Sequence, residues 1–195
     1  MNNLFRFVSG IFLSCAVCAG ENLLTNSSFE ETVPYRKSRF KVELVKDWIC
    51  QMNNGSDVCN ISLVSPGASG KYALRLSSKG KGFNSATYGR NIPVSAGDEV
   101  TAAVKLRGKG QGFFRIWFLN RQGKKLGSQW NKHYIMHGMP AGKEWKTLAM
   151  KITVPDKVAR IQLCLETLGR DDDVLFDDVS LEIRSGNRSG KGKMQ

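Results

Sequence analysis

The chain has 195 residues, of which 41% are hydrophobic, and this share is high enough to exclude a chain too polar to form a core. Its length fits one domain rather than several. Lys and Arg number 29 against 17 Asp and Glu, so the net charge is +12 and the surface should attract polyanions.

Residues 1–20 have the pattern of a targeting segment that is removed on export. Arg6 is the only charged residue before the apolar run from Phe7 to Leu13, and small residues follow as far as Gly20. The run is too short to span a membrane and is typical of a secretory signal. Alternatively, Cys15 marks a lipid-attachment site of the bacterial lipoprotein kind. Either way we expect a secreted, periplasmic or cell-surface protein.

Export would place the remaining cysteines in an oxidising compartment, where disulfides form. Cys50 and Cys59 flank the turn signal at residues 53–55, and we expect them to bridge it. Closing a loop of about ten residues stabilises a protein by roughly 2–3 kcal/mol in the chain-entropy model. The alternative is that both residues are unpaired thiols.

From Leu23 to Ile183 the sequence consists of short apolar or alternating segments separated by turns rich in Gly, Asn, Ser and Pro. No segment keeps a helical period over three turns. Many short strands at this spacing favour a β-sandwich or jelly roll over alternating helices and strands. We therefore predict an all-β fold over residues 21–184, a jelly-roll β-sandwich of two antiparallel sheets. The clearest predicted strands are 61–65, 72–78, 85–94, 99–108, 113–120, 145–154, 159–166 and 174–183.

The segment 113–120 indicates where a ligand would bind. A strand sends alternate side chains to opposite faces, so Phe114, Ile116 and Phe118 face the core. Arg115 and Trp117 face the other way, and a lone Trp on a solvent face is uncommon. An aromatic plane beside a guanidinium suits a flat, hydroxyl-rich ligand. The alternative is an ordinary hydrated sheet face, where Arg, Lys, Gln and Thr are common.

Two other predicted strands supply outward polar side chains by the same alternation. If 99–108 and 159–166 are neighbours of 113–120 in one sheet, their outward side chains line a groove around the tryptophan. Trp130 and Tyr134 lie in a polar segment, GSQWNKHY, that could border this groove. The predicted ligand-binding residues are Trp117, Arg115, Arg107, Gln162 and Trp130.

A set of motifs carries a family resemblance over Asn22 to Ile183. NLLTNSSFEE stands at residues 22–31 and VLFDDVSLEI at 174–183, with GKYALRL, IPVSAGDEVTAAVKLRG, LNRQGK and EWKTLAMKITVP between them in that order. This ordered set resembles a carbohydrate-binding module of the families 4 and 9 (cenC-like) grouping, within the galactose-binding-like jelly rolls. The resemblance implies a β-sandwich with a sugar cleft on its concave sheet. Cleft residues vary in this group, so the groove residues above rest on alternation alone.

The same resemblance implies a structural calcium ion near the chain ends. By motif position, Glu30 of FEE and Asp177 of FDDV would be side-chain ligands, with Asp178 as the alternate. Hard carboxylate oxygens suit calcium. The apolar residues before and after Asp177 also have opposite phases, which predicts a β-bulge that re-aims its side chain. The alternative is that these carboxylates only cap strand ends.

We predict a non-catalytic module that binds a polysaccharide or oligosaccharide. The acidic run Asp171 to Asp173 is typical of a solvated turn, and no Ser stands in a nucleophile-elbow context. The alternative in the enzyme class is a polysaccharide lyase on a jelly roll, which would use His133, Tyr134 and the arginines.

The basic excess leaves a further class open, a polyanion or nucleic-acid binder. Removing the predicted signal with Arg6 lowers the net charge from +12 to +11. Export, and the lack of an interleaved basic and aromatic motif, count against a nucleic-acid partner. The charge instead indicates an anionic glycan, such as a uronate or sulfated polysaccharide, or serves solubility. Part of it lies in residues 185–195, a tail that we predict to be disordered. We expect a monomer without a membrane span.

Overall fold

The computed structural model describes residues 21–53, 55, 57–80, 82–126, 134–168 and 171–186. The predicted signal, Trp130, His133 and most of the predicted tail lie outside these ranges, so what we predict for them stays a prediction. Within the described ranges every regular element is a β-strand, which confirms the all-β class. The same ranges contain no helix long and apolar enough to cross a membrane.

The strands β1 to β13 follow one another along the described chain. Their bounds are β1 Thr32–Lys37, β2 Lys41–Val45, β3 Trp48–Met52, β4 Cys59–Val64, β5 Ala73–Ser78, β6 Asn84–Tyr88, β7 Ile92–Pro93, β8 Glu99–Lys109, β9 Gln111–Leu119, β10 Tyr134–Pro140, β11 Lys146–Thr153, β12 Arg160–Thr167 and β13 Asp173–Arg184.

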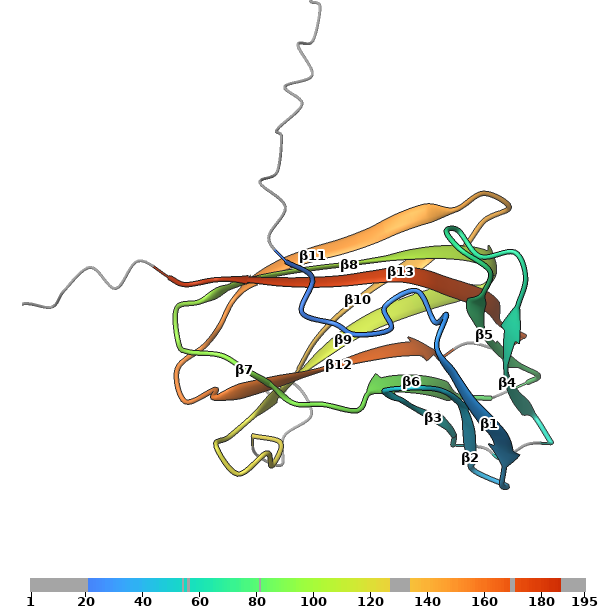
Figure 1. The fold of residues 1–195 in the computed structure, drawn as a ribbon, viewed down its shortest axis with the longest axis horizontal. Coiled ribbons are helices and arrows are strands. Elements are labelled where there is room, and N and C mark those ends of the chain that lie inside the picture. The colour runs from blue at the N-terminus through green and yellow to red at the C-terminus, as the bar shows by residue number, and fades with distance from the viewer. Residues whose placement is uncertain are drawn as a thin grey trace, which may run out of the picture.

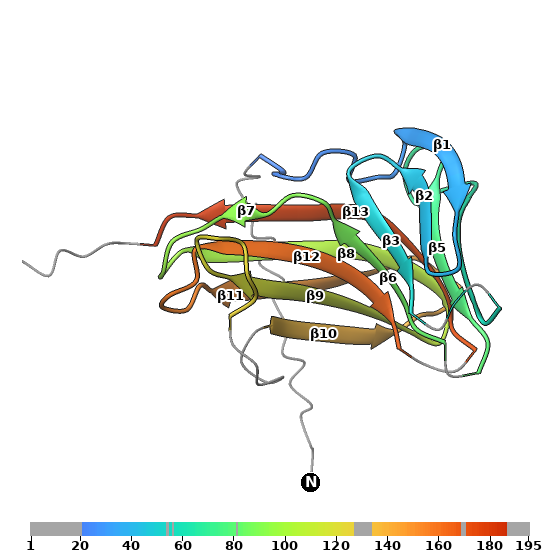
Figure 2. The same cartoon turned by 90° about the horizontal axis from the view of Figure 1, so that it is seen from below.

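These strands form two antiparallel sheets that face each other (Figures 1 and 2). The eight-stranded sheet has the order β1-β2-β3-β6-β12-β9-β10, with β7 paired to β12. The five-stranded sheet has the order β11-β8-β13-β5-β4. Strands that follow one another in sequence therefore often lie in different sheets, and β8 and β9 are one such pair.

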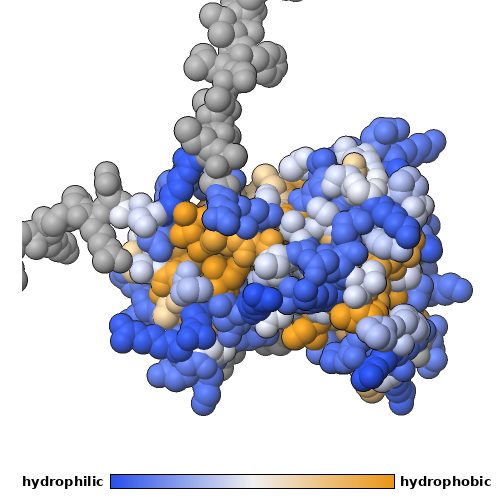
Figure 3. Space-filling model, in the orientation of Figure 1, coloured by the Kyte–Doolittle hydropathy of each residue, from blue (hydrophilic) through white to orange (hydrophobic). Residues whose placement is uncertain are grey.

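The core lies between the two sheets, because each strand turns its apolar set inward. On β9, Phe114 and Ile116 are fully buried and Phe118 is 4% exposed, which confirms the predicted inward set. Leu106 of β8 and Phe176 of β13 meet them from the five-stranded sheet, both fully buried. Figure 3 shows hydrophobic residues gathered between the layers and ringed by hydrophilic ones.

The two motifs at opposite ends of the chain lie side by side. The Leu23 backbone N–H donates to the Leu181 carbonyl oxygen at 3.0 Å, and the Val179 N–H donates to the Ser27 carbonyl oxygen at 3.0 Å. Figure 1 shows this N-terminal segment running along β13. Trp48 anchors the segment, since its indole N–H donates to the Asn26 carbonyl oxygen at 3.1 Å.

The predicted β-bulge is confirmed on β13. The register of β13 against β8 shifts between Asp177 and Ser180. Asp178, inside the shift, has a φ of 47°, a left-handed backbone conformation that Asp tolerates better than most residues. The bulge returns the apolar side chains of β13 to the core while turning Asp177 inward.

The predicted disulfide between Cys50 and Cys59 is wrong, because both residues are free thiols. The turn between them leads from one sheet to the other, so Cys50 lies on β3 and Cys59 on β4. Both side chains are buried in the core. Burial raises the pKa of the Cys50 thiol to about 12, which keeps it protonated and unreactive.

Candidate functional site

The strand registers build lateral rows of side chains on the outward face of the eight-stranded sheet. In one row, Gln162 of β12 stands opposite Trp117 of β9, which stands opposite Tyr134 of β10. The adjacent row contains Ile49, Thr87, Cys164, Arg115 and Met136. Of the predicted groove residues, Trp117, Arg115 and Gln162 therefore come together, and Tyr134 joins them.

Two aromatic rings and two cations form a compact cluster within these rows. The rings of Trp117 and Tyr134 meet edge to face, with their centroids 5.0 Å apart. The Arg115 guanidinium lies 4.3 Å from the centre of the Tyr134 ring and 4.8 Å from that of Trp117. The Lys125 ammonium lies 3.5 Å from the centre of the Trp117 ring. We call these four residues the Trp117 cluster.

The turn after β9 delivers Lys125 to the ring. Asn120 Oδ1 accepts the backbone N–H groups of Gln122 and Lys124, both at 3.0 Å. Gly123 has a φ of 76°, which a side chain would disfavour. The chain then returns along β9, with a bridge between Leu119 and Lys125. Burial lowers the pKa of Lys125, and the neighbouring Arg115 lowers it further.

Arg115 is already neutralised by a buried carboxylate. Its Nη2 lies 2.7 Å from Glu166 Oε2, with Arg115 8% exposed and Glu166 2% exposed. Nη2 also donates to the sulfur of Met136 at 3.2 Å. Burial raises the pKa of Glu166, and the charge of Arg115 opposes that rise. The guanidinium therefore shapes the cluster without adding a free positive charge.

Gln162 is held in a defined orientation at the end of the row. Its Nε2 donates to the carbonyl oxygen of Tyr88 at 3.1 Å, which fixes which edge of the amide faces the sheet. A pre-oriented amide loses little side-chain entropy when it hydrogen-bonds a ligand. Gln162 is half-buried beside Trp117, as a contact residue in a groove would be.

The prediction that Arg107 lies beside Trp117 is wrong. Arg107 does face outward, but β8 belongs to the five-stranded sheet, on the opposite side of the sandwich. Its guanidinium stacks on the Trp145 ring at 4.9 Å. Alternation predicts which face of a strand a residue occupies, and it contains no information about the sheet that the strand joins.

Sequence reasoning missed two contributors to the cluster. Lys125 comes two residues after the turn at Gly123, so a chain reversal there was a signal that it could return to Trp117. Alternation along 159–166 puts Glu166 on the same outward face as Gln162, but its ion pair with Arg115 depends on the pairing of β12 with β9. No sequence pattern predicted that pairing.

The predicted calcium ligands hold one loop, residues 67–72, from two sides. Glu30 Oε1 accepts the backbone N–H groups of Lys71 and Tyr72, both at 2.9 Å. Asp177, fully buried, accepts the N–H of Ala68 at 2.6 Å with Oδ2. Asp178 also contacts this loop, since its Oδ1 accepts a hydrogen bond from the Ser69 hydroxyl, and its Oδ2 lies 2.8 Å from Lys105 Nζ.

Oxygen atoms crowd around Gly67 in that loop. A Cβ at Gly67 would lie 2.6 Å from Asp177 Oδ2, 2.6 Å from the Ser69 carbonyl oxygen and 2.5 Å from the Tyr72 carbonyl oxygen. Carboxylate and carbonyl oxygens are the donors that calcium takes, so the chemistry of this set fits the ion. The described residues contain no group of three or more His, Cys, Asp or Glu side chains arranged to hold a metal. Backbone carbonyls would therefore have to supply much of the coordination.

No family model and no curated protein matches the sequence. Solved structures do match. The enzymatically active domain of tailspike protein 4 of Bacteriophage CBA120 has a TM-score of 0.63 and 16% identity, over 84% of this chain and 21% of that one. The CBM22-1 xylan-binding domain from Paenibacillus barcinonensis has a TM-score of 0.55 and 16% identity, and the match covers 86% of this chain and 97% of that one. The module TmCBM61, solved with β-1,4-galactotriose, has a TM-score of 0.53 and 16% identity, over 85% and 100%.

These likenesses show the fold. The domain is a jelly-roll β-sandwich. It has the architecture of the carbohydrate-binding-module jelly rolls, which confirms the predicted fold class and the predicted grouping of folds. The assignment to families 4 and 9 in particular stays a prediction.

Replacing Glu166 with Gln should change how stability depends on pH. Burial raises the pKa of Glu166 above its ordinary 4.5. A carboxyl group whose pKa is raised by folding stabilises the folded state fully at pH values below its ordinary pKa of 4.5. This stabilisation is lost as the pH rises through the pKa of the folded state. The unfolding free energy of the wild type, relative to Glu166→Gln, should therefore fall from acidic to neutral pH. Denaturant titrations across this range measure it, and a constant difference would contradict the buried placement.

Proposed function

We propose that the outward face of the eight-stranded sheet binds a polysaccharide or oligosaccharide without catalysis. The observation that carries the proposal is the Trp117 cluster, where two aromatic rings stand beside an arginine and a lysine in one row with Gln162. Aromatic rings offer apolar area for the C–H faces of sugar rings. Arginine, lysine and amide groups donate hydrogen bonds to hydroxyl oxygens.

The similar structures support the proposal through the ligands in their names. One is a xylan-binding domain and another was solved with β-1,4-galactotriose. Both are covered almost completely by this chain, so the likeness extends over the whole module. At 16% identity it carries over the architecture, and the choice of sugar depends on this chain's own residues.

Lys125 determines how a sugar would reach Trp117. Its ammonium covers one face of the indole, so a sugar ring that stacks on that face must displace it. A cation–π contact of this kind is worth about 0.5–2 kcal/mol, which a stacking ligand can replace. The displaced ammonium would remain beside the ligand as a donor to its hydroxyl or carboxylate oxygens.

We propose more specifically that the glycan is anionic, and this proposal depends on Lys125. Arg115 is neutralised by Glu166, and Arg107 lies on the other sheet. Lys125 takes part in none of the ion pairs among the described residues. A uronate carboxylate or a sulfate would supply the missing counter-charge in a partly desolvated place, where such a pair is strong.

The lyase alternative rests on weaker support. It needs a general base and acid beside the arginines, and His133 lies outside the described residues. In the Trp117 cluster, Arg115 is committed to Glu166, and Tyr134 is packed against Trp117. New reducing ends or unsaturated-uronate absorbance in a digest would favour the lyase.

Trp117→Ala should abolish retention on immobilised polysaccharide while the domain stays folded. Trp117 is half-buried on the outward face, and a surface substitution costs within about 1 kcal/mol of stability. Phe118→Ala, one residue along, should instead cost about 3–5 kcal/mol, because Phe118 lies in the core. Affinity electrophoresis and denaturant titration measure the two effects. Tyr35→Ala, at an exposed aromatic residue of β1, is the matched control and should bind as the wild type does.

Lys125→Gln should separate an anionic from a neutral ligand. If the ligand carries carboxylate or sulfate, wild-type affinity should fall as salt rises, and the variant should lose both affinity and salt dependence. Retention on matched uronate and neutral polymers at low and high salt measures this. Equal, salt-insensitive binding to a neutral glucan or xylan would rule out the anionic ligand and leave glycan binding intact.

We also propose that calcium binds at the loop 67–72. Asp177 Oδ2 and the carbonyl oxygens of Ser69 and Tyr72 would hold it, with Glu30 fastening the same loop. Bound calcium would neutralise the buried Asp177 carboxylate and tie the loop to β13. The neighbouring carboxylate of Asp178 is paired with the Lys105 ammonium, so its charge is already balanced.

A chelator should lower the melting temperature, and added calcium should restore it. A ligand present at about 100 times its dissociation constant stabilises a protein by roughly 2.7 kcal/mol, so the shift should be large enough to measure. Asp177→Asn should remove the calcium response, whereas Asp178→Asn should keep it. Melting curves that are identical in chelator and in calcium would refute the site.

A further inference from the structure

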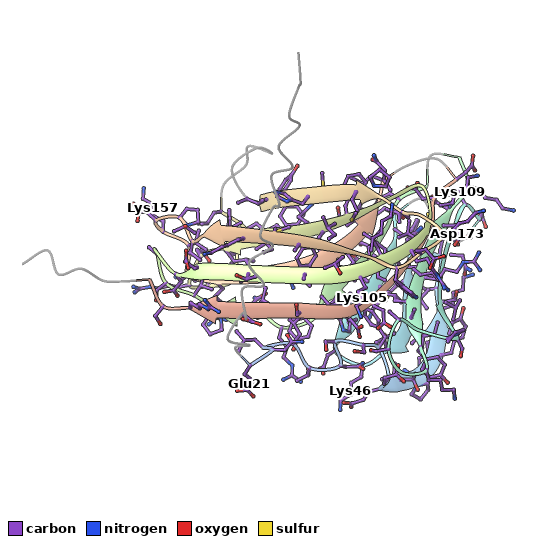
Figure 4. All side chains as sticks on the ribbon, turned by 90° about the horizontal axis from the view of Figure 1, so that it is seen from above. Glu21, Lys46, Lys105, Lys109, Lys157 and Asp173 are labelled. Atoms are coloured by element: carbon purple, nitrogen blue, oxygen red, sulfur yellow. The ribbon has the colours of Figure 1, made fainter. Side chains whose placement is uncertain are left out.

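The outward face of the five-stranded sheet also carries lateral rows of polar side chains. The registers place Asn60 of β4, Ser77 of β5, Asp173 of β13 and Lys109 of β8 in one row. Figure 4 looks onto this sheet, with Lys109 and Asp173 close together at one end. The adjacent row contains Ser62, Arg75, Leu175 and Arg107. Two features singled out from the sequence, Arg107 and the acidic run 171–173, thus meet on a face that the Trp117 cluster does not use.

Two adjoining cavities lie over these rows. One has a volume of about 460 Å³, and its wall includes Asp57, Asn60, Arg75, Lys109 and Asp173. The other has a volume of about 270 Å³ and is lined by residues that include Arg75, Asp173 and Arg107. Because Arg75 and Asp173 line both, the two cavities lie side by side, and we call them together the groove. The larger cavity alone lies within the range of small-ligand sites.

An ion pair at the junction of the cavities presents hydrogen-bonding groups in fixed positions. Arg75 Nε and Nη2 donate to the two carboxylate oxygens of Asp173 at 2.6 and 2.7 Å. The side chains are 38% and 42% exposed, and a pair so exposed stabilises a fold little. Each partner nevertheless orients the other. The three remaining N–H donors of Arg75 and the remaining lone pairs of Asp173 are therefore available in fixed positions in the walls of the groove.

Arg107 is held at the other end of the groove. Its guanidinium stacks on Trp145 at 4.9 Å, so the ring acts as a positioning residue for the arginine. The next residue, Gly108, has a φ of 130°, and a Cβ there would lie 2.1 Å from the Asp173 carbonyl oxygen. Glycine at this position lets β8 and β13 approach closely, which brings Arg107 and Asp173 to one cavity.

The charges around the groove balance. Its walls contain the cations Arg75, Lys79, Arg107 and Lys109 and the carboxylates Asp57, Asp171, Asp172 and Asp173, four of each. A balanced set has no net attraction for a polyanion. It instead offers closely spaced donors and acceptors, together with the amide of Asn60 and the hydroxyl of Ser77. An uncharged molecule with many hydroxyl groups satisfies such a set best.

We propose that this groove is a second carbohydrate-binding site, which takes an uncharged oligosaccharide. Arg75 and Asp173 form paired hydrogen bonds to neighbouring hydroxyl groups, and Arg107 binds the next sugar unit along the groove. The site lies on the opposite sheet from the Trp117 cluster and does not depend on it. With both sites filled, one molecule would bridge two polysaccharide chains, and avidity for an insoluble polymer would rise.

Nuclear magnetic resonance on the ¹⁵N-labelled full chain tests the second site. The probes are β-1,4-galactotriose, a xylo-oligosaccharide, a gluco-oligosaccharide and, for the Trp117 cluster, a uronate oligosaccharide, each titrated separately, with calcium chloride as a further arm. The readouts are the Arg75 Nε–H signal and the indole N–H signals of Trp145 and Trp117. At least one uncharged sugar should move the Arg75 and Trp145 signals, in the wild type and equally in Trp117→Ala.

The Asp173→Asn variant provides the matched loss. The substitution removes the charge that holds Arg75. The dissociation constant obtained from the sugar titration of the Arg75 signal should therefore rise at least about tenfold, as expected when a charge-assisted hydrogen bond is lost. The Trp117 signal should respond as in the wild type. Asp156→Asn, at an exposed aspartate outside the groove, should leave both responses unchanged.

Each other outcome is decisive. If the sugars move only the Trp117 signal, the second site is refuted while the proposed function stands. If they move only the Arg75 and Trp145 signals, the second site stands and the function proposed for the Trp117 cluster falls. If calcium chloride alone moves the Arg75 signal, the groove is a cation site and the inference is wrong. If no probe moves any of these signals, both proposals are wrong.

Discussion

The register between neighbouring strands is the constraint on which both candidate sites depend. Each ladder fixes which outward side chain stands opposite which, and the same pairing holds the sandwich together. A shift of β9 by one residue against β12 would turn Trp117 into the core and Phe118 out to solvent. Such a shift is disfavoured because Phe114, Ile116 and Phe118 are buried. The core therefore determines the outward faces, although none of its residues would touch a ligand.

Burial changes what a charged residue can offer to a ligand. Arg115 is nearly inaccessible and balanced by Glu166, so it contributes shape and ring packing rather than attraction. Lys125, which reaches the same cluster from a turn, takes part in none of the ion pairs among the described residues. On the opposite sheet, Arg75 and Asp173 are exposed enough to meet a ligand, and their pairing orients both. The two faces thus suit ligands of different charge.

Segments from opposite ends of the domain also pack against each other. The N-terminal motif lies along β13, and Glu30 and Asp177, distant in sequence, hold one loop between them. The bulge at Asp177 allows this contact with the loop, because it turns the Asp177 carboxylate inward from β13. Hydrogen bonds from backbone amides satisfy this buried carboxylate in part. A cation bound among the nearby oxygens would complete its compensation.

The sequence by itself determined the strands β4 to β9 and β11 to β13, the inward face of β9 and the bulge, because these depend on the period of apolar side chains along one chain. It therefore predicted the core positions of β9 and the partnership of Trp117 with Arg115. It did not single out β1, β2, β3 and β10, where that period is weaker. Only the tertiary structure decided which strands share a sheet, since pairing depends on contacts between distant segments. That is why Arg107 was placed on the wrong side, why Cys50 and Cys59 were bridged in error, and why the ion pair of Arg115 with Glu166 and the return of Lys125 to the Trp117 ring were missed.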